Sequence, residues 1–119
     1  MKKISMIILV IIAVSCTKSE KYEKIKGEWT CTSWTSEGSD VNKCRDNVYF
    51  KFNEDKTYIS KIGNLKDSGT YKIMNNLLYA TPKGKMQIAV QIIQLQADTL
   101  GLLMNQAGTK EQLILVKKQ

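Results

Sequence analysis

The chain is 119 residues long, carries a formal net charge of +7 and contains no histidine. A chain of this length builds one domain around a single hydrophobic core. Its lysines are spread along the sequence and accompany no recognisable nucleic-acid-reading element, so nucleic acid is not indicated as a partner.

Residues 1–15 predict an export signal. Lys2 and Lys3 precede a mostly apolar run over residues 4–14, which is the order of charges and apolar residues in a secretory signal peptide. The run is shorter than the roughly 20 apolar residues that a membrane-spanning helix needs. The export signal holds two of the 18 basic residues and none of the 11 acidic ones, so its removal lowers the net charge to about +5.

The signal ends in Ala13-Val14-Ser15-Cys16, which resembles a bacterial lipobox. In that motif the cysteine is acylated, for example with palmitate, and becomes the mature N-terminus. Ala13 stands where the strictest form of the motif has leucine, so a plain cleavable secretion signal is the alternative. We expect a lipoprotein attached through Cys16 to the outer membrane of the cell envelope, and the sequence leaves open whether it lies on the periplasmic or the surface face.

We predict three segments in the chain. Residues 1–15 are the lipoprotein signal peptide, residues 16–26 an acylated tether and residues 27–119 a β-barrel domain. The tether is polar, with charges of both signs close together, and we expect a short helical turn around residues 22–26.

From Gly27 onward, short segments rich in threonine, tyrosine and branched aliphatic residues alternate with glycine, asparagine and aspartate. This pattern predicts eight strands, over residues 28–36, 48–52, 57–62, 69–74, 77–81, 85–95, 99–104 and 111–117. Eight sequential antiparallel strands remove their exposed edges by closing into an up-and-down barrel. The predicted fold class is therefore all-β, a small eight-stranded antiparallel barrel.

Four motifs resemble those of bacterial lipocalin-like domains. They are IKGEW at residues 25–29, FKFNEDKTY at 50–58, GTYKI at 69–73 and DTL at 98–100. Lys56 departs from the pattern, because the turn usually has glycine there, and the domain is shorter than a full lipocalin. The resemblance implies a lipocalin-like barrel that binds a small hydrophobic ligand.

The same resemblance implies roles for individual side chains. Trp29 packs across the closed end of the barrel, with Cys31 and Ser33 further along its face. Trp34 lies on the other face, or near the mouth if the strand bends. There it could contact a ligand or partner, or it could pack under the next loop, and both alternatives stay open. The expected interior residues are Phe50, Phe52, Tyr58, Tyr71, Ile73, Ile88, Val90, Leu100 and Leu102. The candidate ligand-binding residues are Phe50, Tyr58, Tyr71, Ile88 and Trp34.

A barrel of eight strands has room for interior side chains or for one small ligand. Because the predicted strands are short, a filled core is favoured over a deep ligand cup.

Cys31 and Cys44 are the two cysteines that remain after the anchor. Outside the cytoplasm an even pair predicts a disulfide. This bridge would tie the first strand to the polar loop that follows it and make that loop rigid. A metal site is not predicted, because two cysteines without histidine cannot fill a tetrahedral zinc shell.

The residue types do not predict an enzyme or a cofactor. Without histidine the chain lacks the side chain that most readily acts as a base near neutral pH. Glu54 and Asp55 share one turn, whereas a glycosidase pair faces across a cleft.

Two non-catalytic functions stay open. The first is a membrane-anchored module that binds a small hydrophobic ligand. The alternative is a protein-interaction module of the envelope, such as a periplasmic inhibitor of the lysozyme-inhibitor type or an assembly factor, with its contacts on the loop of residues 36–45. Fold class does not separate these two functions.

Overall fold

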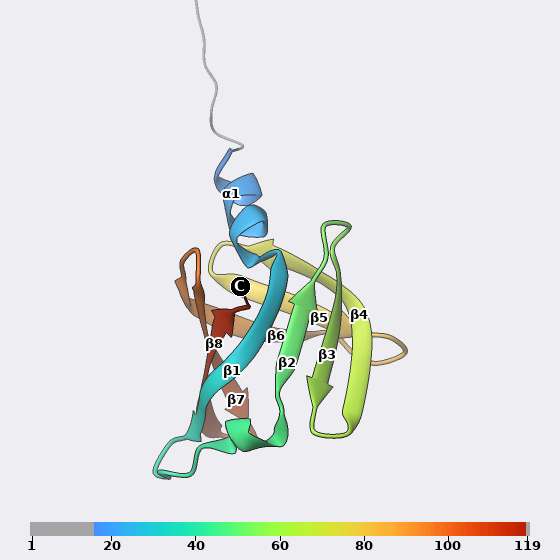
Figure 1. The fold of residues 1–119 in the computed structure, drawn as a ribbon. Coiled ribbons are helices and arrows are strands. Elements are labelled where there is room, and N and C mark those ends of the chain that lie inside the picture. The colour runs from blue at the N-terminus through green and yellow to red at the C-terminus, as the bar shows by residue number, and fades with distance from the viewer. Residues whose placement is uncertain (1–15, 119) are drawn as a thin grey trace, which may run out of the picture.

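The computed structural model describes residues 16–118, which form one helix followed by eight strands (Figure 1). The elements are α1 (Cys16–Ile25), β1 (Gly27–Ser36), the 3₁₀ turn η1 (Lys43–Asp46), β2 (Tyr49–Phe52), β3 (Thr57–Ile62), β4 (Leu65–Met74), β5 (Leu77–Pro82), β6 (Ile88–Leu95), β7 (Thr99–Gln106) and β8 (Thr109–Lys117). The signal-peptide prediction falls on residues 1–15, which lie outside the described residues. No described helix is both long and apolar enough to cross a membrane.

Each strand pairs antiparallel with the next one, and β1 pairs with β8, so the sheet closes into a barrel. The prediction of an eight-stranded up-and-down barrel is confirmed. The turns after β2, β4 and β6 lie at the same end as α1, which we call the closed end (Figure 1). The connections after β1, β3, β5 and β7 lie at the opposite end, which we call the mouth.

Local sequence explains why the strands turn where they do. In β3, Tyr58 and Ser60 are buried while Ile59 is exposed, as expected for the period of two of a strand with one inner face. Asn75 has φ 56° in the turn between β4 and β5, a left-handed conformation that asparagine tolerates. Lys56 has φ 67° in the turn between β2 and β3, so a lysine occupies the position where the family pattern has glycine.

Gly69 permits the close approach of β4 and β5. A Cβ atom added at this residue would lie 2.0 Å from the carbonyl oxygen of Thr81. The atoms that this Cβ would meet belong to the backbone of β5, which cannot turn aside as a side chain can, so a side chain here would force the two strands apart. Glycine is therefore required at this position for the barrel to keep its width.

The core fills the closed half of the barrel. Trp29, Leu100 and Leu115 are completely buried, together with Ile25 at the end of α1. The remaining buried apolar side chains are Val48, Phe52, Tyr58, Tyr71, Ile73, Leu78, Ile92, Leu102 and Leu113. Of the expected interior residues, Phe50 and Val90 are half-buried against this core, and Ile88 is 54% exposed at the mouth. Ile88 faces the inside of the barrel, as Val90 does, but it is exposed because β6 begins there, at the rim.

Helix α1 closes one end of the barrel. The indole Nε1 of Trp29 donates a 2.7 Å hydrogen bond to the carbonyl oxygen of Ile25. The hydroxyl oxygen of Tyr22 accepts a 2.8 Å hydrogen bond from the backbone N–H of Ile73, and the Lys56 ammonium lies 4.6 Å from the Tyr22 ring centroid. The helix is longer than the short turn predicted for residues 22–26, and its last two turns are part of the packed structure.

Candidate functional site

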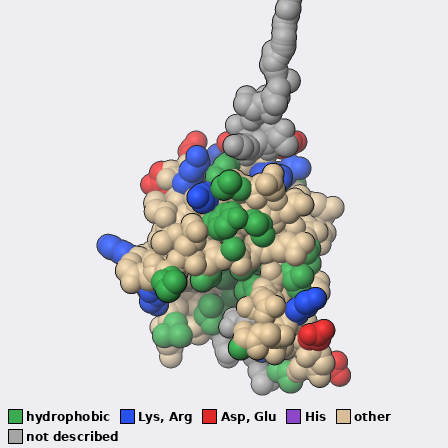
Figure 2. Space-filling model, turned by 180° about the vertical axis from the view of Figure 1, so that it is seen from behind, with side chains coloured by type: hydrophobic (Ala, Val, Ile, Leu, Met, Phe, Trp, Pro, Cys, Tyr) green, Lys and Arg blue, Asp and Glu red, His purple; other side chains and the backbone are tan. Residues whose placement is uncertain are grey.

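A cavity of about 250 Å³ opens at the mouth of the barrel. We call it the cup. Its wall is formed by Trp34, Phe50, Phe52, Tyr58, Ser60, Ile62, Asp67, Leu78, Ala80, Pro82, Ile88, Val90, Leu102, Met104 and Leu113. Nearly all of these side chains are apolar. In the view from behind, apolar side chains gather around a hollow in the lower half of the molecule (Figure 2). A cavity of about 150 Å³ with an apolar lining already holds a benzene-sized molecule, so the cup has room for a small ligand.

The barrel is thus filled at one end and hollow at the other. This differs from the sequence analysis, which favours a filled core over a ligand cup. Four of the five candidate ligand-binding residues line the cup, namely Trp34, Phe50, Tyr58 and Ile88. The fifth, Tyr71, lies below it at the closed end and donates a 3.0 Å hydrogen bond to the carbonyl oxygen of Asn53. Burial raises the pKa of Tyr71 to about 12, so its hydroxyl remains a hydrogen-bond donor at neutral pH.

A β-bulge in β1 turns Trp34 into the cup. The pairing of β1 with β8 shifts between Cys31 and Ser33, and the extra residue reverses the inside–outside alternation beyond it. Trp34, not Ser33, consequently lines the cup, which corrects the expectation that Ser33 shares the face of Trp29. The alternative that placed Trp34 near the mouth of a bent strand is the one observed.

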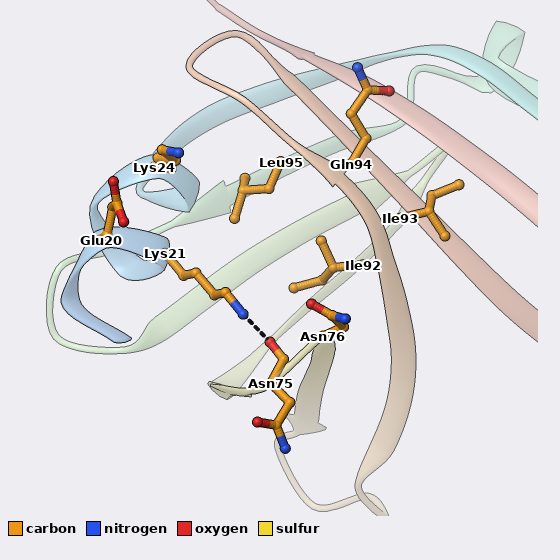
Figure 3. A pocket seen from close by; sticks show the side chains of 9 residues that line it. All are labelled: Glu20, Lys21, Lys24, Asn75, Asn76, Ile92, Ile93, Gln94 and Leu95. Carbon is orange, nitrogen blue, oxygen red and sulfur yellow. Dashed lines mark hydrogen bonds between the residues drawn. The ribbon is translucent and has the colours of Figure 1, made fainter. Parts of the chain in front are cut away.

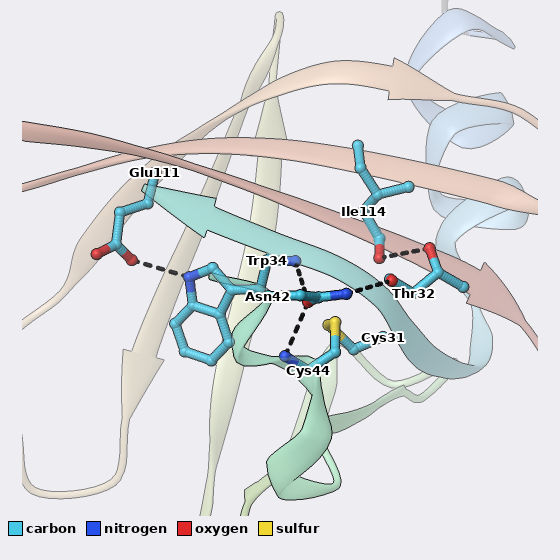
Figure 4. The surroundings of a disulfide bond; sticks show 7 residues. All are labelled: Cys31, Thr32, Trp34, Asn42, Cys44, Glu111 and Ile114. Atoms are coloured by element: carbon cyan, nitrogen blue, oxygen red, sulfur yellow. Dashed lines mark hydrogen bonds between the residues drawn. A yellow bond between two sulfur atoms is a disulfide. The ribbon is translucent and has the colours of Figure 1, made fainter. Parts of the chain in front are cut away.

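The loop after β1 is held in place by a disulfide and by one asparagine (Figure 4). The Cys31–Cys44 disulfide is present, with a Cα–Cα distance of 5.5 Å. The Asn42 side-chain oxygen accepts 3.0 Å hydrogen bonds from the backbone N–H groups of Trp34 and Cys44. Its amide nitrogen donates a 3.1 Å hydrogen bond to the carbonyl oxygen of Thr32, so the same side chain satisfies backbone groups around the bulge.

A second polar group fixes Trp34 from the side of β8. Glu111 accepts hydrogen bonds from the Trp34 indole at 2.8 Å, from the Lys43 ammonium at 2.8 Å and from the Ser36 hydroxyl at 3.0 Å. The Glu111 side chain is only 10% exposed. The hydrogen bonds from Lys43 and then Trp34 outweigh the effect of burial and hold the pKa of Glu111 below its usual value. The group joins β1, η1 and β8 at the rim of the cup.

We expect this carboxylate to make the mouth sensitive to acid. A lowered folded-state pKa means that Glu111 stabilises the fold above its unfolded pKa of about 4.3, and that this stability is lost as the pH falls through the folded value. Glu111→Gln should lower the free energy of unfolding at pH 7 by about 1–2 kcal/mol and flatten its decline in acid. Urea unfolding between pH 7 and pH 3 measures both effects.

Glu54→Gln is the matched control, because Glu54 is 85% exposed and its ammonium partner Lys26 lies 3.8 Å away. An exposed pair of this kind contributes little. Equal acid sensitivity in the two variants would contradict the role given to Glu111.

A second hollow lies outside the barrel, between α1, the turn after β4 and strand β6 (Figure 3). Its volume is about 270 Å³. The apolar floor of Ile92 and Leu95 is bordered by the charged side chains of Glu20, Lys21 and Lys24, and Lys21 donates a hydrogen bond to the carbonyl oxygen of Asn75. This hollow is an open groove on the surface. We place the functional site in the cup, which is apolar and surrounded by strands.

Several residues at the mouth were not found from the sequence. Asn42, Ser60, Asp67 and Glu111 are polar residues whose positions depend on which strands face each other, and no short motif marks them. Among the described residues, no three histidine, cysteine, aspartate or glutamate side chains lie close enough together to hold a metal ion.

Comparison with known proteins identifies the family. The profile of the lipocalin-like domain matches residues 25–102. The chain belongs to the lipocalin-like domain family. The family is one of binding barrels that are generally not enzymes, and its fold suggests that this lipocalin-like protein binds a small molecule.

Solved structures agree on the fold. An uncharacterized protein from Bacteroides eggerthii has a TM-score of 0.60 at 12% identity, covering 79% of this chain and 99% of its own. A lipocalin-like protein from Bacteroides uniformis has a TM-score of 0.60 at 14% identity, covering 80% of this chain and 99% of its own. No curated protein sequence matches the chain.

Proposed function

We propose that this lipocalin-like protein is a non-catalytic lipoprotein of the outer membrane, acylated at Cys16, that holds a small hydrophobic molecule in the cup. The observation that carries the proposal is an apolar cavity of about 250 Å³ inside the mouth of the barrel. Apolar surface that is exposed to water in an open cavity gains free energy when an apolar ligand covers it.

The position of α1 supports the anchoring. Cys16 is the first residue of α1, and α1 packs on the closed end of the barrel (Figure 1). Acyl chains on this cysteine would therefore leave the cup facing away from the bilayer, where a ligand can enter. Incorporation of labelled palmitate tests this part of the proposal, and we expect Cys16→Ser to abolish the label.

The cup is tested by blocking it with one side chain. Ala80 lines the cup from β5, whereas Ala89 is exposed on the neighbouring strand β6. Native mass spectrometry of the protein isolated from its own envelope should show a bound small molecule. We expect Ala80→Trp to lose this molecule and Ala89→Trp, the matched control, to keep it.

A bound molecule that survives in Ala80→Trp would place the ligand elsewhere. A bare mass for both the unchanged protein and the control would contradict ligand binding.

The second candidate function, a protein-interaction module, is favoured by the rim of the mouth. Val41 and Met86 lie in two connections, and Leu65 and Ile88 are the first residues of β4 and β6. All four are between 54% and 86% exposed. A protein partner retained in place of a small molecule, and lost in a Leu65→Lys, Met86→Lys variant, would favour this candidate.

A further inference from the structure

The cup contains two polar side chains that face each other. Ser60 on β3 pairs directly with Asp67 on β4, and both residues line the cavity. The inward positions closer to the closed end are Tyr58 and Gly69, and the next pair toward the mouth is Ile62 with Leu65. The polar pair therefore lies between the apolar floor of the cup and its rim.

Ser60 is buried, and no described side chain or backbone group bonds to its hydroxyl group. It is 8% exposed, and this hydroxyl takes part in no hydrogen bond among residues 20–44, 47–105 and 107–118, whose side chains the structure describes. Most buried polar groups in proteins are paired, and an unpaired one lowers stability. A hydroxyl group kept at this cost, and directed into an open cavity, is available to a ligand.

Asp67 is also incompletely satisfied. One carboxylate oxygen accepts a hydrogen bond from the backbone N–H of Ser68, and the other lies 3.4 Å from the ammonium of Lys85. The Lys85 side chain is 68% exposed, so this contact is a weak surface ion pair. A carboxylate has about four acceptor sites, which leaves Asp67 with free capacity.

A second inward-facing carboxylate of the mouth, that of Glu111, differs from Asp67. Both oxygens of Glu111 are occupied, by the Trp34 indole on one side and by Lys43 and Ser36 on the other. The charge of Asp67, in contrast, acts on the interior of the cup, since it raises the pKa of Tyr58 in addition to the larger effect of burial.

We propose that the ligand of the cup is a cationic amine with an apolar body, whose ammonium group is bound by the Asp67 carboxylate and the Ser60 hydroxyl. This inference rests on the proposed function of the cup. The ammonium donates hydrogen bonds to the Ser60 hydroxyl and to the Asp67 carboxylate, which has acceptor capacity left, and its apolar body lies deeper, against Leu78 and Leu102. Lys85 is the protein's own cation at this site, and the ligand displaces it.

The test uses three probes with the same apolar body, namely hexylamine, hexanol and hexanoate. Each is titrated at pH 7 into the isotope-labelled full chain, and the backbone amide signals of β3 and β4 report on occupation of the cup. We expect hexylamine to bind about tenfold more tightly than hexanol, as a charge-assisted hydrogen bond implies, and hexanoate to bind most weakly.

Variants assign the preference to its residues. Asp67→Asn should lower the affinity for hexylamine about tenfold and leave the affinity for hexanol unchanged within about twofold. Asp98→Asn is the matched control, because it removes the same charge from an exposed turn at the closed end. Lys85→Ala should raise the affinity for hexylamine about threefold, because it removes the competing cation.

The outcomes separate the two proposals. If hexanol binds and hexylamine binds no better, or if Asp67→Asn and Asp98→Asn behave alike, the amine inference is wrong and the cup remains. If none of the three probes shifts the amide signals of the cup, the proposed function fails and the inference fails with it.

Discussion

Trp29→Ala should lower the free energy of unfolding by about 3–5 kcal/mol, the usual cost of truncating a large buried aromatic residue. Trp29 is completely buried and its indole N–H donates a 2.7 Å hydrogen bond to the carbonyl oxygen of Ile25. The substitution therefore leaves a cavity at the closed end and also removes the hydrogen bond that joins β1 to α1. Urea unfolding, followed by circular dichroism, measures the loss.

Two further substitutions separate the causes. Trp29→Phe keeps most of the ring and removes the hydrogen bond, so we expect a loss of about 1–2 kcal/mol. Trp34→Ala truncates the other tryptophan of the chain, which is only half-buried at the mouth, and should cost less than Trp29→Ala. A loss below about 1 kcal/mol for Trp29→Ala would show that the closed end is not held by this side chain.

Replacing both Cys31 and Cys44 by serine should lower the free energy of unfolding by about 2–3 kcal/mol. The two residues are 13 positions apart, and closing a loop of about this length is worth roughly 3 kcal/mol in the chain-entropy description. The three hydrogen bonds of Asn42 persist in the variant, so the loop should keep its path while its amides exchange faster. Denaturant unfolding and hydrogen exchange of the Trp34 and Cys44 amides provide the two measurements.

Reductant supplies the control for this prediction. It should destabilise the unchanged protein by the same amount as the double substitution and have no effect on the double variant. Reduction without any loss of stability would mean that the Asn42 hydrogen bonds alone hold the loop.

The sequence predicted the barrel well because alternation in its strands is strong. Residues 57–62 were assigned without error, since inward Tyr58 alternates with outward Ile59 and the flanking turns are polar. Strand β4 was predicted to begin at Gly69, whereas it begins at Leu65. The four missed residues include Asp67. Its polar side chain lies on the inner face of the barrel, so it interrupts the alternation by which strands are recognised in the sequence.

The rest of the site depends on contacts that a single sequence does not display. The bulge in β1 decides that Trp34 faces the cup, and its position follows from pairing with β8 at the other end of the chain. In the sequence, nothing distinguishes Glu111 from other polar strand residues. Its role depends on Trp34 and Lys43, which β1 and η1 place beside it in the fold. The polar composition of α1 did not indicate a packed helix. Tyr22 and Ile25 are nevertheless three residues apart, on one helical face, and both pack on the barrel.

The pairing of β1 with β8 has a consequence for how the chain folds. All other strand pairs join neighbours in the sequence, but this seam joins the first strand to the last. During synthesis, the edges of β1 and β7 have no partner until Thr109–Lys117 has been made. The barrel therefore closes only after β8 has been made, and a chain that stops before β8 presents two open sheet edges that favour aggregation.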